Sequence, residues 1–364
     1  MKILVDDGGR YNKYSGYGQL SRTIVQALSR AGHECLLIPQ RPILADDLAF
    51  NITRVPGVTF FEESSAYDLV FRISPPSRTQ YPGESVLYTQ NGLSDLRQEW
   101  QRDIQDHSQI IVPSTFDADV FKKYHHSVNV CPQAVHNDLY RPVPKYRKER
   151  NDDFQFLFVG SFSFRKGVDL LFSILAEAAL AVRDRKIGLS IYCPTGLSET
   201  AHSLDRLIEW TRNAPENLAF HVVNKELSPR WMSRIYNQHD AVLTFSRGEG
   251  WCMPLYEGLL SKKPVVAPDS TAMGECLPRD GVIRVPVQAR AAQDVKDEFG
   301  QTFVHLYGEQ EIQFFEVDAE ESVRAIVDMI TNYSRYEKEA EEGRRYILEN
   351  YSIEAISSTL SALV

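Results

Sequence analysis

Short apolar segments alternate with longer amphipathic ones along almost the whole chain. The chain begins with an apolar segment at 2–5 and a glycine-rich loop, and another apolar segment follows at 34–38. Between them, Leu20, Ile24 and Leu28 are spaced so that they share one face of a helix. Alternating strands and helices are typical of α/β proteins, whose mainly parallel sheets are joined by right-handed crossovers. The alternation therefore predicts this fold class.

The same reasoning places strands and helices in both halves of the chain. The expected strands of the first half are 2–5, 34–38, 68–73, 85–89 and 109–112, with a helix that begins after Ser114. The expected strands of the second half are 154–160, 188–193, 218–223, 241–245, 265–267, 282–285 and 313–317. Helices are expected at 168–183, 203–213, 229–238, in one piece at 320–349, and from 352 to the end.

The segment 141–153 separates the two halves. It is rich in proline and charged residues and almost empty of apolar ones, which is typical of a linker between domains. A chain of 364 residues is long enough for two domains with a core each. We therefore predict two doubly wound, Rossmann-like domains over 1–145 and 146–345, followed by a helical end over 346–364.

Charge and cysteine usage exclude several classes of protein. The formal net charge of −9 disfavours a nonspecific nucleic-acid binder. No apolar run approaches membrane-spanning length, and the first residues lack an apolar stretch of secretory type. The five cysteines are scattered without a C-x-x-C pair, which favours reduced thiols. We expect a cytoplasmic protein and leave a peripheral contact with the inner membrane face open.

The segment 247–269, RGEGWCMPLYEGLLSKKPVVAPD, carries two carboxylates eight positions apart, Glu249 and Glu257. Pro254 suits the first turn of a short helix, because a residue there needs no amide hydrogen-bond partner. The amides and the dipole at the start of such a helix attract anions, phosphates above all. Glu257 lies near the same end and can accept hydrogen bonds from the hydroxyls of a nucleotide.

A second segment, 158–171, places Arg165 and Lys166 just before a helix. Cations at a helix start are unfavourable for the helix itself, because its dipole is positive there. The pair therefore indicates that an anion lies close to both side chains. Arginine offers a bidentate fork and lysine a mobile point charge, a combination that suits a diphosphate.

Together these segments resemble the signature of the retaining glycosyltransferases of family 4 (glycosyl transferases group 1), which have the two-domain GT-B fold. The similar residues are the E-G-x-x-x-P-x-x-E-G pattern and the R-K-G before the helix. The resemblance implies a metal-independent transferase that uses a UDP- or GDP-linked sugar. It implies that Glu249 faces the donor sugar, Glu257 the ribose, and Arg165 with Lys166 the diphosphate. Many members have arginine directly after the strand glycine, where this chain has Ser161.

The resemblance also implies roles elsewhere. Backbone amides of the loop with Gly16 and Gly18, and those near Trp251, Cys252 and Met253, would approach the diphosphate. Tyr17 is a candidate for acceptor contact. Gln90 and Asn91 stand where many members have a histidine near the donor sugar. The last helix would return to the first domain.

The D-x-D sequence at Asp117-Ala118-Asp119 has the form of a metal motif. Because acidic residues are favoured at a helix start by the helix dipole alone, we expect no metal there.

Three alternatives stay open at this point. A GT-B phosphorylase or sugar-nucleotide epimerase would share the phosphate-binding elements. A noncatalytic protein that binds carbohydrate or a sugar nucleotide could keep the same fold. An oxidoreductase would suit the strand–loop–helix start, but the G-x-G-x-x-G fingerprint is missing. The sequence does not identify the sugar, the acceptor or the oligomeric state.

Overall fold

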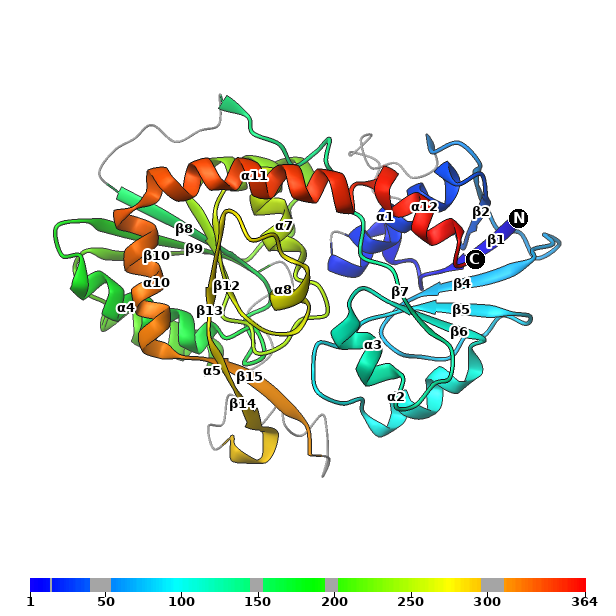
Figure 1. Ribbon diagram of the computed structural model, residues 1–364, viewed down its shortest axis with the longest axis horizontal. Helices are drawn as coiled ribbons and strands as arrows, with labels where there is room; N and C mark the ends of the chain where they lie inside the picture. Colours follow the sequence, from blue (N-terminus) through cyan, green and yellow to red (C-terminus); the bar gives the residue numbers. More distant parts are fainter. Residues whose placement is uncertain (14, 40–53, 145–152, 194–201, 296–310) are drawn as a thin grey trace. The chain divides into compact units, whose positions relative to one another are not determined.

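The computed structural model describes residues 1–13, 15–39, 54–144, 153–193, 202–295 and 311–364. By the contacts within it, the chain divides into two compact units. Unit 1 comprises Met1–Asn137 with Leu348–Val364, and unit 2 comprises Asp138–Ile347. Both units contain a parallel sheet with helices, as Figure 1 shows, so the predicted α/β class with two Rossmann-like domains is confirmed.

Unit 1 contains a seven-stranded sheet in which every neighbouring pair is parallel. In spatial order its strands are β3 (Val58–Phe60), β2 (Glu34–Leu37), β1 (Lys2–Asp6), β4 (Leu69–Ile73), β5 (Ser85–Tyr88), β6 (Gln109–Val112) and β7 (Val128–Val130). From β1 the chain first adds β2 and β3 on one side. It then adds β4 to β7 on the other side of β1. The boundary between β1 and β4 is therefore the switch point of the sheet, where doubly wound folds bind ligands.

The helices of unit 1 include one from the end of the chain. They are α1 (Gly16–Arg30), α2 (Gln98–Asp103), α3 (Thr115–Phe121) and α12 (Ile353–Ser361), with short 3-10 helices at Arg10–Asn12 and Ile104–Asp106. Helix α12 packs against α1, as Figure 1 shows. Its first turn is capped by Ser352, whose side chain accepts a hydrogen bond from the amide of Ala355 at 3.2 Å.

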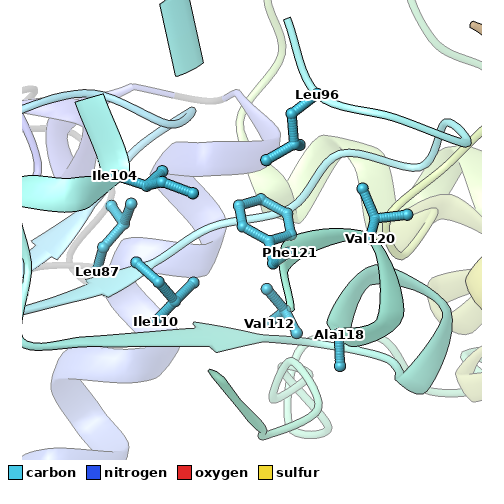
Figure 2. Close-up of a cluster of buried hydrophobic side chains, with 8 residues drawn as sticks. All are labelled: Leu87, Leu96, Ile104, Ile110, Val112, Ala118, Val120 and Phe121. Atoms are coloured by element: carbon cyan, nitrogen blue, oxygen red, sulfur yellow. The ribbon is translucent and has the colours of Figure 1, made fainter. Parts of the chain in front are cut away.

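A buried apolar cluster fixes α3 against the sheet of unit 1 (Figure 2). Its members come from β5, β6, α3 and the segment between β5 and β6: Leu87, Leu96, Ile104, Ile110, Val112, Ala118, Val120 and Phe121. Full burial of a side chain such as leucine, isoleucine or phenylalanine stabilises a fold by about 1.5–3 kcal/mol. The cluster therefore holds the loop after β5 and the start of α3 in fixed positions.

Unit 2 contains a second parallel sheet of six strands. In spatial order these are β10 (Leu218–Val223), β9 (Lys186–Tyr192), β8 (Asp153–Val159), β11 (Ala241–Leu243), β12 (Val265–Pro268) and β13 (Val282–Val285). The order reverses between β8 and β11, which is the switch point of this sheet.

The remaining helices belong wholly or mainly to unit 2. They are α4 (Val168–Ala181), α5 (His202–Arg212), α6 (Pro229–Gln238), α7 (Met253–Leu260), α8 (Thr271–Cys276), α10 (Ala319–Thr331) and α11 (Tyr333–Tyr351), with a 3-10 helix at Ala292–Asp294. Helix α10 packs against α4. No helix in the described parts of the chain is both long enough and apolar enough to cross a membrane.

The expected single helix over 320–349 is wrong. Asn332 separates α10 from α11, with backbone angles of φ −110° and ψ 26° that end the first helix. Its side-chain amide donates to Asp328 at 2.5 Å, and Tyr336 of the next helix also donates to that carboxylate. Local hydrogen bonds to Asp328 thus fix the break between the two helices.

The expected strand at 313–317 forms, but outside the main sheet. It is β15 (Gln313–Val317), which pairs antiparallel with β14 (Val287–Ala291) in a two-stranded sheet. The sequence analysis also missed the short elements β3, β7, β14, α2 and α8, which are three to six residues long. Most of the predicted linker, at 145–152, lies outside the described residues.

Candidate functional site

Two loops follow the strands that flank the switch point of unit 2. One runs from the end of β8 to α4 and carries Arg165 and Lys166, and the other runs from the end of β11 to α7 and carries Glu249. The structure brings these three side chains together. Lys166 Nζ lies 2.5 Å from Glu249 Oε1, and Arg165 Nη1 lies 3.2 Å from the same oxygen. Parallel strands on either side of the switch point place both loops at one edge of the sheet.

The Glu249 carboxylate is buried and strongly stabilised in its charged form. Besides the two cations, the hydroxyl of Ser246 donates to Glu249 Oε1 at 2.8 Å. Burial alone would raise the pKa of Glu249, but the charges of Lys166 and Arg165 and the hydrogen bonds from Lys166 and Ser246 lower it to about 2. Glu249 is therefore an anion at every physiological pH.

Close backbone packing fixes the relative position of the two loops. Gly167 caps α4 in the left-handed region at φ 67°, and a Cβ there would lie 2.1 Å from the carbonyl oxygen of Phe245. Only glycine fits such a contact without displacing the backbone. The amide of Arg247 donates to the carbonyl of Arg165 at 2.7 Å, and the Arg165 guanidinium donates to the carbonyl of Gly248 at 2.7 Å.

Arg247 is a part of this site that the sequence analysis did not single out. Its buried guanidinium donates to both oxygens of Asp169, at 2.8 and 2.7 Å, and to Glu316 at 3.0 Å. It also lies over the ring of Phe164, 3.8 Å from the centroid. Asp169 and Glu316 share the charge of this buried cation, so Arg247 joins α4 and β15 to the loop that carries Glu249. Its place in the loop after an apolar strand, two residues before Glu249, was the available signal.

Helix α7 presents the other predicted residues of unit 2. Trp251 is buried and stacks on Tyr256, with ring centroids 4.5 Å apart and planes 2° apart. Cys252 precedes the helix in the left-handed region at φ 71°, and burial raises the pKa of its thiol to about 12. Met253 begins the helix and is buried. The loop before α7 is thus held by aromatic stacking and burial, with a neutral thiol at its turn.

Glu257 is buried in α7 and receives a hydrogen bond within unit 2. The hydroxyl of Tyr236, on α6, donates to Glu257 Oε2 at 2.6 Å. Burial and the neighbouring carboxylate raise the pKa of Tyr236 well above its usual value. The neutral phenol therefore fixes one oxygen of Glu257.

In unit 1, the loop after β1 is fixed by a buried acid. Asp7 accepts from the amides of Gly9 at 2.8 Å and Tyr11 at 2.6 Å, and from the hydroxyl of Ser21 at 2.5 Å. Burial raises the pKa of Asp7, although these hydrogen bonds oppose the shift. This acid belongs to no motif in the sequence, and its contacts explain why the loop turns back onto α1.

The two predicted glycines of this loop differ. A Cβ on Gly18 would lie 2.2 Å from the carbonyl oxygen of Lys13, so the loop itself requires glycine there. A Cβ on Gly16 would meet nothing within 4 Å, so the first turn of α1 is open at this point. Tyr17 is half-buried and lies beside Arg10, whose guanidinium is 5.9 Å from the ring centroid.

Gln90 and Asn91 follow β5 at the same edge of the sheet. Gln90 accepts a hydrogen bond from Gln133 at 2.6 Å. The amides of Asn91 and Gly92 donate to the carboxylate of Asp117, at 3.2 and 2.9 Å. Asp117 is therefore a buried anchor for this loop.

The other acid of the D-x-D sequence, Asp119, is exposed. Over the parts of the chain that the structure describes, no three His, Cys, Asp or Glu side chains are grouped as a metal site would require.

A known family of proteins resembles part of this chain. The family model described as "Glycosyl transferases group 1" matches residues 153–308, which lie within unit 2 and include Arg165, Lys166, Glu249 and Glu257. No curated protein matches the chain.

Solved structures resemble the whole chain. A sucrose-phosphate synthase from Thermosynechococcus elongatus matches with a TM-score of 0.68 at 14% identity, over 100% of this chain and 97% of its own. Alr3699/HepE of Anabaena, solved with UDP and glucose, matches with a TM-score of 0.67 at 14% identity, over 100% of this chain and 99% of its own. A glycosyltransferase from Rickettsia africae matches with a TM-score of 0.67 at 12% identity, over 100% and 97%. The chain has the GT-B fold.

Proposed function

We propose that the chain is a glycosyltransferase that moves a sugar from a nucleoside-diphosphate sugar to a hydroxylated acceptor. One observation carries the proposal: Arg165, Lys166 and Glu249 converge at the switch point of unit 2. The family-model match over 153–308 covers the same residues. Phosphorylases and epimerases would need similar cations, so the acceptor-dependent release of nucleotide is the property that separates them from a transferase.

Glycosyl transfer requires groups that stabilise a leaving diphosphate, such as cations and backbone amides. Breaking the bond between the anomeric carbon and the diphosphate leaves negative charge on the phosphate oxygens and positive charge on the sugar. Preorganised cations and amides stabilise such charge most effectively when they already lie in fixed positions. In our proposal Arg165 and Lys166 bind the diphosphate together with the amides around Trp251, Cys252 and Met253. Their fixed positions follow from the backbone contacts of Gly167 and Arg247.

The two glutamates receive different roles in this proposal. Glu257 binds the ribose hydroxyls, with Tyr236 holding one of its oxygens. Glu249 orients hydroxyls of the donor sugar and is not a covalent nucleophile. We propose that the configuration at the anomeric carbon is retained and that no metal takes part, since two cationic side chains can neutralise the leaving group.

The donor base is proposed to be uracil. HepE structures were solved with UDP and glucose and with UDP-glucose, and another similar structure, a pneumococcal O-GlcNAc transferase, was solved with UDP and GlcNAc. We also propose roles for five residues of unit 1. The loop with Gly16 and Gly18 would bind the diphosphate, Tyr17 would contact the acceptor, and Gln90 and Asn91 would bind the donor sugar.

A panel of sugar nucleotides tests the function. Wild-type protein should be stabilised against heat by UDP-sugars more than by GDP-sugars, and UDP should be released when a suitable acceptor is added. Lys166→Ala should lose the stabilisation, while Lys186→Ala, an exposed lysine at the opposite edge of the same sheet, should keep it. Equal stabilisation of wild type and Lys166→Ala would refute the assignment of the donor site.

A further inference from the structure

We propose that Glu249 is a built-in competitor of the donor: it pairs with Arg165 and Lys166 until a diphosphate displaces it. The proposal rests on the proposed function, because it assumes that these two cations bind a diphosphate. It adds a step, since the cations must exchange one anion for another before the donor is bound.

The contacts of the Glu249 carboxylate with Lys166, Ser246 and Arg165 converge on one oxygen. Lys166 Nζ, Ser246 Oγ and Arg165 Nη1 lie 2.5, 2.8 and 3.2 Å from Oε1. Because both cations share this single acceptor, a small movement of one carboxylate breaks both ion pairs at once. The cations need not move far, since Arg165 is also held by the carbonyl of Gly248 at 2.7 Å.

The three side chains differ in exposure. The side chain of Glu249 is 8% exposed, that of Lys166 is 15% exposed and that of Arg165 is 30% exposed. Glu249 is thus the most buried of the three, and both cations keep some surface that an anion from solution can contact.

The exchange is chemically favourable for a diphosphate and poor for weaker anions. A diphosphate carries more charge than one carboxylate and offers several oxygens, so each cation gains an acceptor of its own. The displaced Glu249 keeps a hydrogen-bond donor in Ser246, which lies in the same loop and need not follow the cations. A buried carboxylate without any donor would be costly, and Ser246 lowers that cost.

Removal of the charge on Glu249 tests the exchange. The probe is inorganic pyrophosphate, titrated calorimetrically into the full-length protein without divalent metal. Glu249→Gln keeps the shape of the side chain and should bind pyrophosphate about 10-fold more tightly than wild type. Glu177→Gln removes the same charge from an exposed position on α4 and should leave the affinity unchanged. Because Glu249→Gln also loses both ion pairs, Glu249→Asp is a second variant: it keeps the charge on a shorter side chain and should give a smaller gain in affinity.

The controls separate this inference from the proposed function. Lys166→Ala should lose pyrophosphate binding alone and in combination with Glu249→Gln. If Lys166→Ala binds pyrophosphate as wild type does, the donor site itself is misassigned. If Lys166→Ala loses binding but Glu249→Gln binds no more tightly than wild type, the donor site stands and the competition by Glu249 is refuted.

Discussion

Two buried carboxylates, Asp7 and Glu249, lie in loops that follow strands β1 and β11, and they have opposite kinds of hydrogen-bond partners. Asp7 in unit 1 accepts from two backbone amides and a hydroxyl. Glu249 in unit 2 accepts from two cationic side chains and a hydroxyl. The pKa of Asp7 is raised by burial, whereas the pKa of Glu249 is lowered to about 2 because the cations outweigh its burial.

We propose that this difference separates a structural acid, Asp7, from a functional one, Glu249. Two of the partners of Asp7 are backbone amides of its own loop, which must be satisfied for the loop to form. Two of the partners of Glu249 are cationic side chains, whose charge an anion from solution could share. A buried acid in a loop is therefore not by itself evidence of function. The kind of hydrogen-bond donor that it faces is the more informative feature.

The largest effect is expected at Lys166. In our proposal Lys166→Ala removes a charge that stabilises the leaving diphosphate, so kcat/KM should fall by about 10²–10³-fold. Measuring UDP release with a working acceptor gives this ratio, and Lys186→Ala serves as control. The kcat/KM of folded and purified Asp7→Asn should fall far less. A fall as large as that of Lys166→Ala would contradict the proposed distinction between the two acids.

The contributions of the two carboxylates to the unfolding free energy should change in opposite directions as the pH falls. The folded pKa of Glu249, about 2, lies below its ordinary value of 4.5, so its stabilisation is complete above pH 4.5 and is lost as the pH falls toward 2. At pH 6 the difference in unfolding free energy between wild type and Glu249→Gln should be at most about 3 kcal/mol. Denaturant titrations from pH 6 to pH 3 should show this difference shrinking; a constant difference would mean that the ion pairs do not stabilise the fold.

Asp7→Asn should destabilise unit 1 by about 1–3 kcal/mol. The substitution replaces one carboxylate oxygen by an amide group, so one of the groups that donate to Asp7 loses its hydrogen-bond acceptor. The pKa of Asp7 is raised above its ordinary value of 3.8 in the folded state, so the stability linked to its protonation is present below that value and is lost as the pH rises. The deficit of Asp7→Asn should therefore grow toward acid pH, opposite to the trend of Glu249→Gln. The same denaturant titrations measure it, and parallel trends for the two variants would contradict the difference in their environments.

The smallest effect on stability is expected at Gly16. Gly16→Ala should change the unfolding free energy by less than about 0.5 kcal/mol, since a Cβ there meets nothing within 4 Å. If the start of α1 approaches the donor, kcat/KM should nevertheless fall several-fold. Gly18→Ala is the matched comparison, and its thermal midpoint should fall because a Cβ would lie 2.2 Å from the carbonyl of Lys13. Full activity of Gly16→Ala would remove Gly16 from the proposed site.

The fold was predictable where periodicity was strong. Long apolar strands such as β8 and amphipathic helices such as α1 carry their period in the sequence, and both sheets follow from their alternation. Strands of three residues, such as β3 and β7, are too short to carry a period. The break at Asn332 depends on hydrogen bonds to Asp328, which no apolar pattern records.

The candidate site was predictable only in part. The motif spacing brought Arg165, Lys166 and Glu249 to notice, and the structure places them in contact. In the structure the acid beside the two cations is Glu249, and their binding of a diphosphate stays a prediction. The structural role of Arg247 could not be read from the sequence, because its partners Asp169 and Glu316 are distant along the chain.

A crystal structure of the protein with UDP bound tests most directly whether Arg165 and Lys166 hold the diphosphate. We expect phosphate oxygens within about 2.7–3.2 Å of Lys166 Nζ and of the Arg165 guanidinium, with the ribose beside Glu257. UDP bound with its phosphates away from both cations, while Lys166 and Arg165 still contact Glu249, would show that the proposed donor site is wrong.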